Sequence, residues 1–144
     1  MPTFKHILVP TDFEEASEHA LEAALDLAQD LDAEVTIVHV IQAPPIYYSA
    51  YAQGLAWPVE ELDGAARRAL DDALAAAKKR YGKVDAVLLN GAPRVQILEA
   101  VVDRKADVIV MGTHGRRGIV RAVLGSVAES IVRTSPVPVL TVGA

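Results

Sequence analysis

Residues 108–126, with the sequence VIVMGTHGRRGIVRAVLGS, decide the fold expected for this chain. An apolar run of strand type ends at Gly112, a loop rich in glycine and arginine follows, and the pair Gly125-Ser126 opens a helix. Glycine lets backbone N–H groups approach an anion without a Cβ in the way, and a helix N-terminus adds unpaired N–H donors. The stretch therefore predicts a strand, loop and helix that together hold phosphate.

Positive charge gathers in this loop, although the chain as a whole carries a net charge of −5. Arg116, Arg117 and Arg121 lie within six residues of one another. Arg116 and Arg117 either add charge at the outer phosphates of a ligand or stay solvated as ordinary loop arginines. The residues alone leave both roles open.

The glycine spacing is Gly112-x-x-Gly115, nine residues, and then Gly125-Ser126. It resembles the nucleotide-binding signature of the universal stress protein family, in its ATP-binding branch. The opening segment ILVPTD (7–12) and the closing segment SPVPVLTV (135–142) resemble the same family, so the likeness spans nearly the whole chain. It implies one universal stress protein domain over residues 1–144. It also implies ATP as the ligand, with Mg²⁺ or Mn²⁺ bridging its phosphates, and a role as a nucleotide-dependent sensor or regulator in the stress response.

Apolar runs alternate with helical periodicity along the rest of the chain, as expected for an α/β fold with right-handed crossovers. This predicts an open, five-stranded parallel sheet with helices on both faces, Rossmann-like. The family resemblance implies the strand order 3-2-1-4-5, which brings Asp12 beside the glycine loop. Strands are expected at 4–9, 35–41, 84–89, 107–111 and 137–142, and helices at 21–31, 58–77, 93–102 and 120–132.

Composition excludes several classes of function. The chain has 144 residues and no cysteine, which excludes disulfides, thiolate metal sites and cysteine nucleophiles. Its acidic charge argues against binding to nucleic acid. No apolar run reaches membrane-spanning length and the first residues lack the layout of a signal peptide, so no membrane insertion and a cytoplasmic location are expected.

Asp12 directly follows the first expected strand. The resemblance implies that its carboxylate hydrogen-bonds the nucleoside. The alternative is a helix cap, because Asp12-x-x-Glu15 has the spacing of a capping box. The two carboxylate oxygens could serve both roles. Many relatives carry serine two positions after this aspartate, where this chain has Glu14, so the usual capping hydroxyl is absent there.

The resemblance assigns the other nucleotide contacts to strand ends and to the glycine loop. Val40 would meet adenine through its backbone, and Met111 would form part of the wall. The alternative for the glycines is a connection that needs positive φ, with Ser126 as an ordinary helix cap. No catalytic or metal-binding side chain is assigned. The complete candidate set is Pro10, Thr11, Asp12, Val40, Met111, Gly112, His114, Gly115, Arg116, Gly125, Ser126 and Val127.

The four histidines have different expected roles. His114 lies in the glycine loop, where a hydrogen bond to ribose or phosphate is favoured over a general-base role. His6 and His39 lie on expected strands and are interpreted as core or edge histidines with satisfied hydrogen bonds. His19 is expected to face solvent from the first helix.

Two further regions predict interactions. The aromatic segment 44–57 could be a lid over the nucleotide, a patch for a partner protein, or a loop that buries its own side chains. The last strand, 137–142, has a hydrophobic edge that needs a partner or a cover. Family members commonly dimerise through this strand, so a homodimer is expected, together with a regulatory protein partner whose identity is unknown.

Two other classes of function compete with a nucleotide sensor. One is an enzyme, either a slow ATPase or an adenylyl transferase of a related α/β fold. Against it, the chain lacks the phosphate loop Gly-x-x-x-x-Gly-Lys-[Ser/Thr], the His-x-Gly-His element and the Gly-x-Ser-x-Gly elbow. The other is a dimeric interaction protein that binds no nucleotide, against which the intact glycine spacing speaks.

Overall fold

A computed structural model of the protein describes residues 3–42, 54, 59–113 and 124–143. Strands and helices alternate through the described residues, as the sequence predicts. The elements are β1 (His6–Pro10), α1 (Glu15–Leu31), β2 (Glu34–Ile41), α3 (Val59–Arg80), β3 (Val84–Asn90), α4 (Pro93–Asp103), β4 (Val108–Gly112), α5 (Ser126–Thr134) and β5 (Val139–Val142).

The five strands form one parallel sheet in the order β3-β2-β1-β4-β5, which confirms the expected topology. The central strand β1 pairs with β2 on one side and with β4 on the other. All strands are parallel, so the segments that follow β1, β2 and β4 leave the sheet at the same edge. In open α/β sheets this edge, beside the point where the strand order reverses, is where ligands bind.

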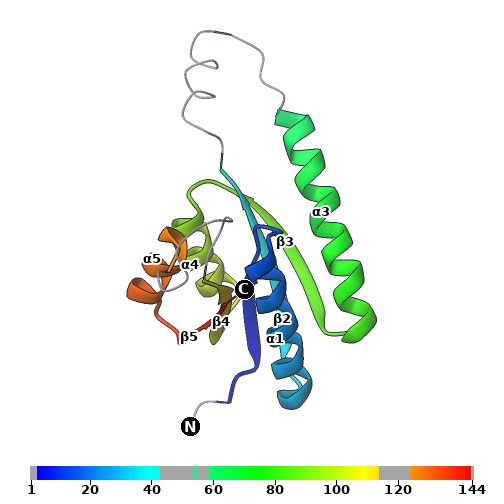
Figure 1. Ribbon diagram of the computed structural model, residues 1–144, viewed down its shortest axis with the longest axis vertical. Helices are drawn as coiled ribbons and strands as arrows, with labels where there is room; N and C mark the ends of the chain where they lie inside the picture. Colours follow the sequence, from blue (N-terminus) through cyan, green and yellow to red (C-terminus); the bar gives the residue numbers. More distant parts are fainter. Residues whose placement is uncertain (1–2, 43–53, 55–58, 114–123, 144) are drawn as a thin grey trace.

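Helices cover both faces of the sheet (Figure 1). The helices α1 and α3 pack on one face, and α4 and α5 pack on the other. Side chains of β1 alternate between the two cores, with Ile7 and Val9 facing α1 and α3 and Leu8 facing α4 and α5. Burial on both faces explains why the strand sequences are almost continuously apolar.

The structure corrects the expected start of the last helix. Apolar periodicity placed that start at Val120, but α5 begins at Ser126, and Leu124 and Gly125 are not helical. Gly125 is extended, with φ −62° and ψ 161°, and serves as the N-cap. Periodicity alone overruns the boundary because the apolar residues continue upstream of the cap.

The apolar residues that mark α4 in the sequence are not all on its buried face. Val95 and Val102 are 40% and 68% exposed, whereas Ile97, Ala100 and Val101 are buried against the sheet. On α3, Leu70 and Ala77 form the buried contact. None of the helices in the described residues is long and apolar enough to cross a bilayer.

Candidate functional site

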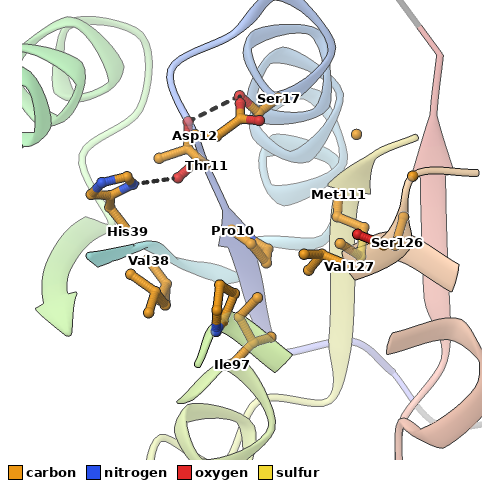
Figure 2. A pocket seen from close by; sticks show the side chains of 15 residues that line it. Pro10, Thr11, Asp12, Ser17, Val38, His39, Ile97, Met111, Ser126 and Val127 are labelled. Carbon is orange, nitrogen blue, oxygen red and sulfur yellow. Dashed lines mark hydrogen bonds between the residues drawn. The ribbon is translucent and has the colours of Figure 1, made fainter. Parts of the chain in front are cut away.

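A pocket opens at the carboxyl ends of β1, β2 and β4, where the first turns of α4 and α5 also meet (Figure 2). Nine of the twelve candidate residues lie in its lining. The other three, His114, Gly115 and Arg116, fall outside the described residues. The lining consists of Pro10, Thr11, Asp12, Ser17, Val38, His39, Val40, Pro93, Ile97, Met111, Gly112, Gly125, Ser126, Val127 and Ala128.

Most of the wall is apolar, and it is assembled from several elements. Pro10 ends β1, Val38 and Val40 lie on β2, Ile97 comes from α4, and Met111 lies on β4. Val38, Ile97 and Met111 also belong to the core under α4 and α5, so the floor of the pocket is part of the packed interior. Such a wall can bury a flat, apolar ring system, which suits the base of a nucleotide.

The polar part of the lining is a tight turn after β1. The Thr11 hydroxyl donates to Ser17 Oγ at 3.1 Å, and Ser17 Oγ donates to Asp12 Oδ1 at 2.8 Å. The backbone N–H of Glu14 also donates to Asp12 Oδ1, at 2.9 Å. Two donors therefore fix one carboxylate oxygen, while Oδ2 makes no hydrogen bond within the described part of the chain.

This geometry overturns the capping-box alternative for Asp12. The helix α1 begins at Glu15 and its N-cap is Glu14, so Asp12 lies two residues before the cap. Asp12 instead accepts the N–H of the residue two positions on, which is the geometry of an Asx turn. Position 14 has no hydroxyl, and the hydroxyl that donates to Asp12 belongs to Ser17, which was not among the candidate residues.

His39 also borders this turn. Its Nδ1 lies 2.7 Å from the Thr11 carbonyl oxygen, and its ring centroid lies 4.5 Å from that of Phe13. Figure 2 shows His39 directed at the Thr11 backbone from the neighbouring strand. The expectation of a satisfied histidine is confirmed, but its place in the lining of the pocket was not anticipated.

The described glycines of the signature serve different purposes. A Cβ on Gly112 would lie 2.7 Å from the carbonyl carbon of Ala16, so β4 approaches α1 too closely for any side chain. Neither Gly112 nor Gly125 has positive φ. The alternative interpretation of these glycines, a connection that needs positive φ, is therefore wrong for both. Ser126 is the first helical residue, not the cap.

The N-terminus of α5 opens into the pocket through Gly125, Ser126 and Val127. The N-cap makes no side-chain hydrogen bond to the first turn, and the Gly125 N–H donates to the Thr113 carbonyl at 2.6 Å. Unpaired N–H groups and the positive end of the helix dipole favour an anion at such a terminus. Within the residues described, no group of three or more His, Asp or Glu side chains could hold a metal ion.

A second polar network lies at the opposite end of the sheet. His6 contacts the Arg104 carbonyl through Nδ1 at 2.8 Å and the buried Thr36 hydroxyl through Nε2 at 2.6 Å. Thr36 in turn donates to Asp85 at 2.6 Å, and Arg104 pairs with the same carboxylate. His6 is thus a histidine whose ring nitrogens both have hydrogen-bond partners, as expected.

A separate ion pair lies near the same end of the sheet, where a hydrogen bond to Asp32 raises the pKa of Lys83.

Sequence reasoning missed six residues of the lining. Two of them, Pro93 and Ala128, follow from one general signal, because the first turn of a helix after a strand lies at the carboxyl edge of the sheet. Ser17 had a weaker signal, as a hydroxyl five residues after Asp12, and it lies in the first turn of α1. The missed residues are Ser17, Val38, His39, Pro93, Ile97 and Ala128.

A family model, sequence relatives and solved structures all agree with this fold. The model of the universal stress protein family matches residues 3–143. Universal stress protein MJ0531 of Methanocaldococcus jannaschii is 36% identical over 141 residues, which cover 96% of this chain and 82% of that relative. The structure of MJ0577, a universal stress protein of the same organism, superposes with a TM-score of 0.79 at 29% identity, covering 99% of this chain and 98% of the other. A universal stress protein solved in complex with cAMP gives a TM-score of 0.70 at 25% identity, covering 99% and 98%.

Proposed function

The chain belongs to the universal stress protein family, and we propose that its pocket binds an adenine nucleotide, with ATP as the natural ligand. One observation carries the proposal: the same pocket is lined by an apolar wall, by the Asp12 carboxylate and by the N-terminus of α5. Among the described residues, Asp12 Oδ2 has no hydrogen-bond partner and no side chain caps this helix. These three parts match a base, a ribose and a phosphate. The similar protein solved with cAMP supports the choice of an adenine nucleotide.

Each part of the ligand has a proposed place. The base lies against Val38 and Val40 of β2 and Ile97 of α4, where backbone groups of β2 can recognise its edge. Asp12 Oδ2 accepts a hydrogen bond from the nucleoside, because a carboxylate only accepts and the ribose hydroxyls are donors. The phosphates lie at the N-terminus of α5, with His114, Gly115 and Arg116 completing their binding site.

A divalent cation fits this arrangement as a companion of the phosphates. Mg²⁺ keeps several waters and is usually bound by one or two carboxylates together with substrate phosphates, so it needs no dedicated cage of side chains. We therefore expect Mg²⁺ or Mn²⁺ to bind with ATP and not in its absence.

As a member of this family, the protein is proposed to act as a nucleotide-dependent regulator in the stress response. Bound ATP is proposed to act through the glycine loop and the aromatic segment 44–57, most of which lie outside the described residues, and so to change a surface read by a protein partner. The whole chain, 1–144, is proposed to form one domain that acts in the cytoplasm.

A homodimer through β5 is the proposed assembly. This strand lies at the edge of the sheet, next to β4, and Leu140 on it is 46% exposed. Val132 of α5 is a further exposed apolar side chain, 47% exposed, on the element that precedes β5. An unpaired edge strand with exposed apolar side chains is stabilised by pairing with a second copy.

Amide chemical shifts test the location of the site. Titration of ATP and Mg²⁺ into the isotopically labelled protein is expected to move the amide signals of Thr11, Val40 and Val127. Signals of His6 and Thr36, at the opposite end of the sheet, should not move. Shifts confined to that opposite end, or no shifts at all, would contradict the proposed site.

A further inference from the structure

His39 lies where β2 continues beyond the end of β1. The last residue of β1, Pro10, pairs with Val38, whereas the next three residues of β2 pair only with β3. Beyond Pro10 the chain leaves the sheet and forms the turn that carries Asp12. A side chain at position 39 therefore lies beside that turn, whereas the earlier residues of β2 lie beside β1.

Two hydrogen bonds from β2 hold the Thr11 peptide groups. The Thr11 N–H donates to the Val38 carbonyl at 2.8 Å, and the Thr11 carbonyl lies 2.7 Å from His39 Nδ1. A carbonyl oxygen only accepts, so Nδ1 must carry the hydrogen in this contact. The second bond depends entirely on the side chain of His39.

Phe13, on the other side of Asp12, has an unusual backbone conformation. Its φ is +65°, in the left-handed region that a bulky residue seldom adopts and that persists only where the surroundings hold it. Phe13 is held from two sides. Its N–H donates to Thr11 Oγ1 at 3.0 Å, and its ring packs on the ring of His39 at 4.5 Å with an interplanar angle of 41°.

His39 thus contacts the residue before Asp12 and the residue after it. We propose that His39 is a positioning residue that fixes the turn at Asp12 and so directs Asp12 Oδ2 to the nucleoside. This inference rests on the proposed nucleotide-binding function. His39 itself needs no contact with the ligand in this role, because it acts through its hydrogen bond to the Thr11 carbonyl, while its ring packs beside that of Phe13.

His6 offers a matched comparison within the same sheet. It too contacts a backbone carbonyl through Nδ1, that of Arg104 at 2.8 Å, but it does so at the end of the sheet away from the pocket. Loss of either contact should lower stability to a similar degree. Only the loss at His39 should change ligand affinity.

Two amide substitutions separate the hydrogen bond from general packing. In His39→Asn the amide nitrogen takes nearly the place of Nδ1 and can still donate to Thr11, whereas in His39→Gln it lies farther out. We expect ATP affinity within about twofold of wild type for His39→Asn and about fivefold to tenfold weaker for His39→Gln, the range set by one net hydrogen bond. His6→Gln should leave affinity within about twofold of wild type, with melting temperature measured for every variant.

A double-mutant cycle with Asp12→Asn decides whether His39 acts through Asp12. In that background His39→Gln should weaken ATP binding by less than about twofold further, because the carboxylate it positions is gone. Equal losses in both backgrounds, or equal affinities for His39→Asn and His39→Gln, would overturn the positioning role while leaving the proposed function intact. Failure of the wild-type protein to bind ATP would overturn both.

Discussion

Gly112 and Ala16 touch backbone to backbone: a Cβ on Gly112 would lie 2.7 Å from the carbonyl carbon of Ala16 and 2.9 Å from its Cβ. The contact joins the end of β4 to the first turn of α1, and so brings the segments after β1 and β4 together at the pocket. The first glycine of the phosphate signature is therefore also a packing residue.

Gly112→Ala should destabilise the fold. The added methyl group meets backbone atoms that cannot rotate away, so we expect a loss of about 1–3 kcal/mol in the free energy of unfolding, as for other overpacked sites. Urea unfolding measures this loss. Gly82→Ala is the matched control, since a Cβ at Gly82 meets no atom within 4 Å, and it should change stability by less than about 0.5 kcal/mol. A Gly112→Ala protein as stable as the control would contradict the packing role.

Ser17→Ala should affect both stability and ligand binding. The substitution removes one of the two donors to Asp12 Oδ1 and leaves the Thr11 hydroxyl without its acceptor. We expect a loss of about 1 kcal/mol in unfolding free energy together with weaker ATP binding, because the carboxylate can then rotate. Ser130→Ala, on α5, removes a hydroxyl that makes no hydrogen bond to any residue described. If both variants bind ATP as the wild type does, Ser17 has no part in orienting Asp12.

Thr36→Val should weaken the fold without touching the site. Valine keeps the shape of threonine but leaves His6 Nε2 and Asp85 Oδ1 without the hydroxyl that joins them. The expected loss is about 1–3 kcal/mol by thermal or urea unfolding, with ATP affinity unchanged. Thr141→Val, on the edge strand β5, is the isosteric control and should be close to neutral. Equal stability of the two variants would show that the buried network adds nothing.

Leu140→Lys should break the proposed dimer. A lysine at this position of the edge strand would bring its charge into the apolar contact between two copies, and inward charges block edge pairing. Sedimentation is expected to show a dimer for the wild type and a monomer for the variant. Val102→Lys is the control, because Val102 is more exposed but lies on α4, which packs over β2 and β3. A monomeric wild-type protein would refute the dimer directly.

Much of the fold follows from the sequence because it depends on local patterns. Nearly continuous apolar runs such as 35–41 identify strands buried on both faces, and Pro93 marks the start of α4. The strand order came only from the family resemblance. The sequence prediction started the last helix too early, because apolar residues continue upstream of Gly125. The extended conformation of Gly125 sets the actual boundary, and α5 begins at the next residue.

Part of the site was predictable because its residues belong to a sequence motif. Asp12, Met111 and Ser126 follow from a motif, and the pocket contains all three. His39 and Ile97 enter the lining through the register of β2 and the position of α4, which no local pattern records. Position 14 is a glutamate and carries no hydroxyl, and only the turn geometry reveals that Ser17 donates one to Asp12.

Calorimetric titration of ATP with Mg²⁺ is the most direct test of the central claim that this pocket holds an adenine nucleotide. The wild-type protein is predicted to bind one nucleotide per chain in a saturable manner. Gly115→Val is predicted to remain folded and lose this binding, while Gly82→Val keeps it. Absence of saturable binding by the wild type, or undiminished binding by Gly115→Val, would contradict the account.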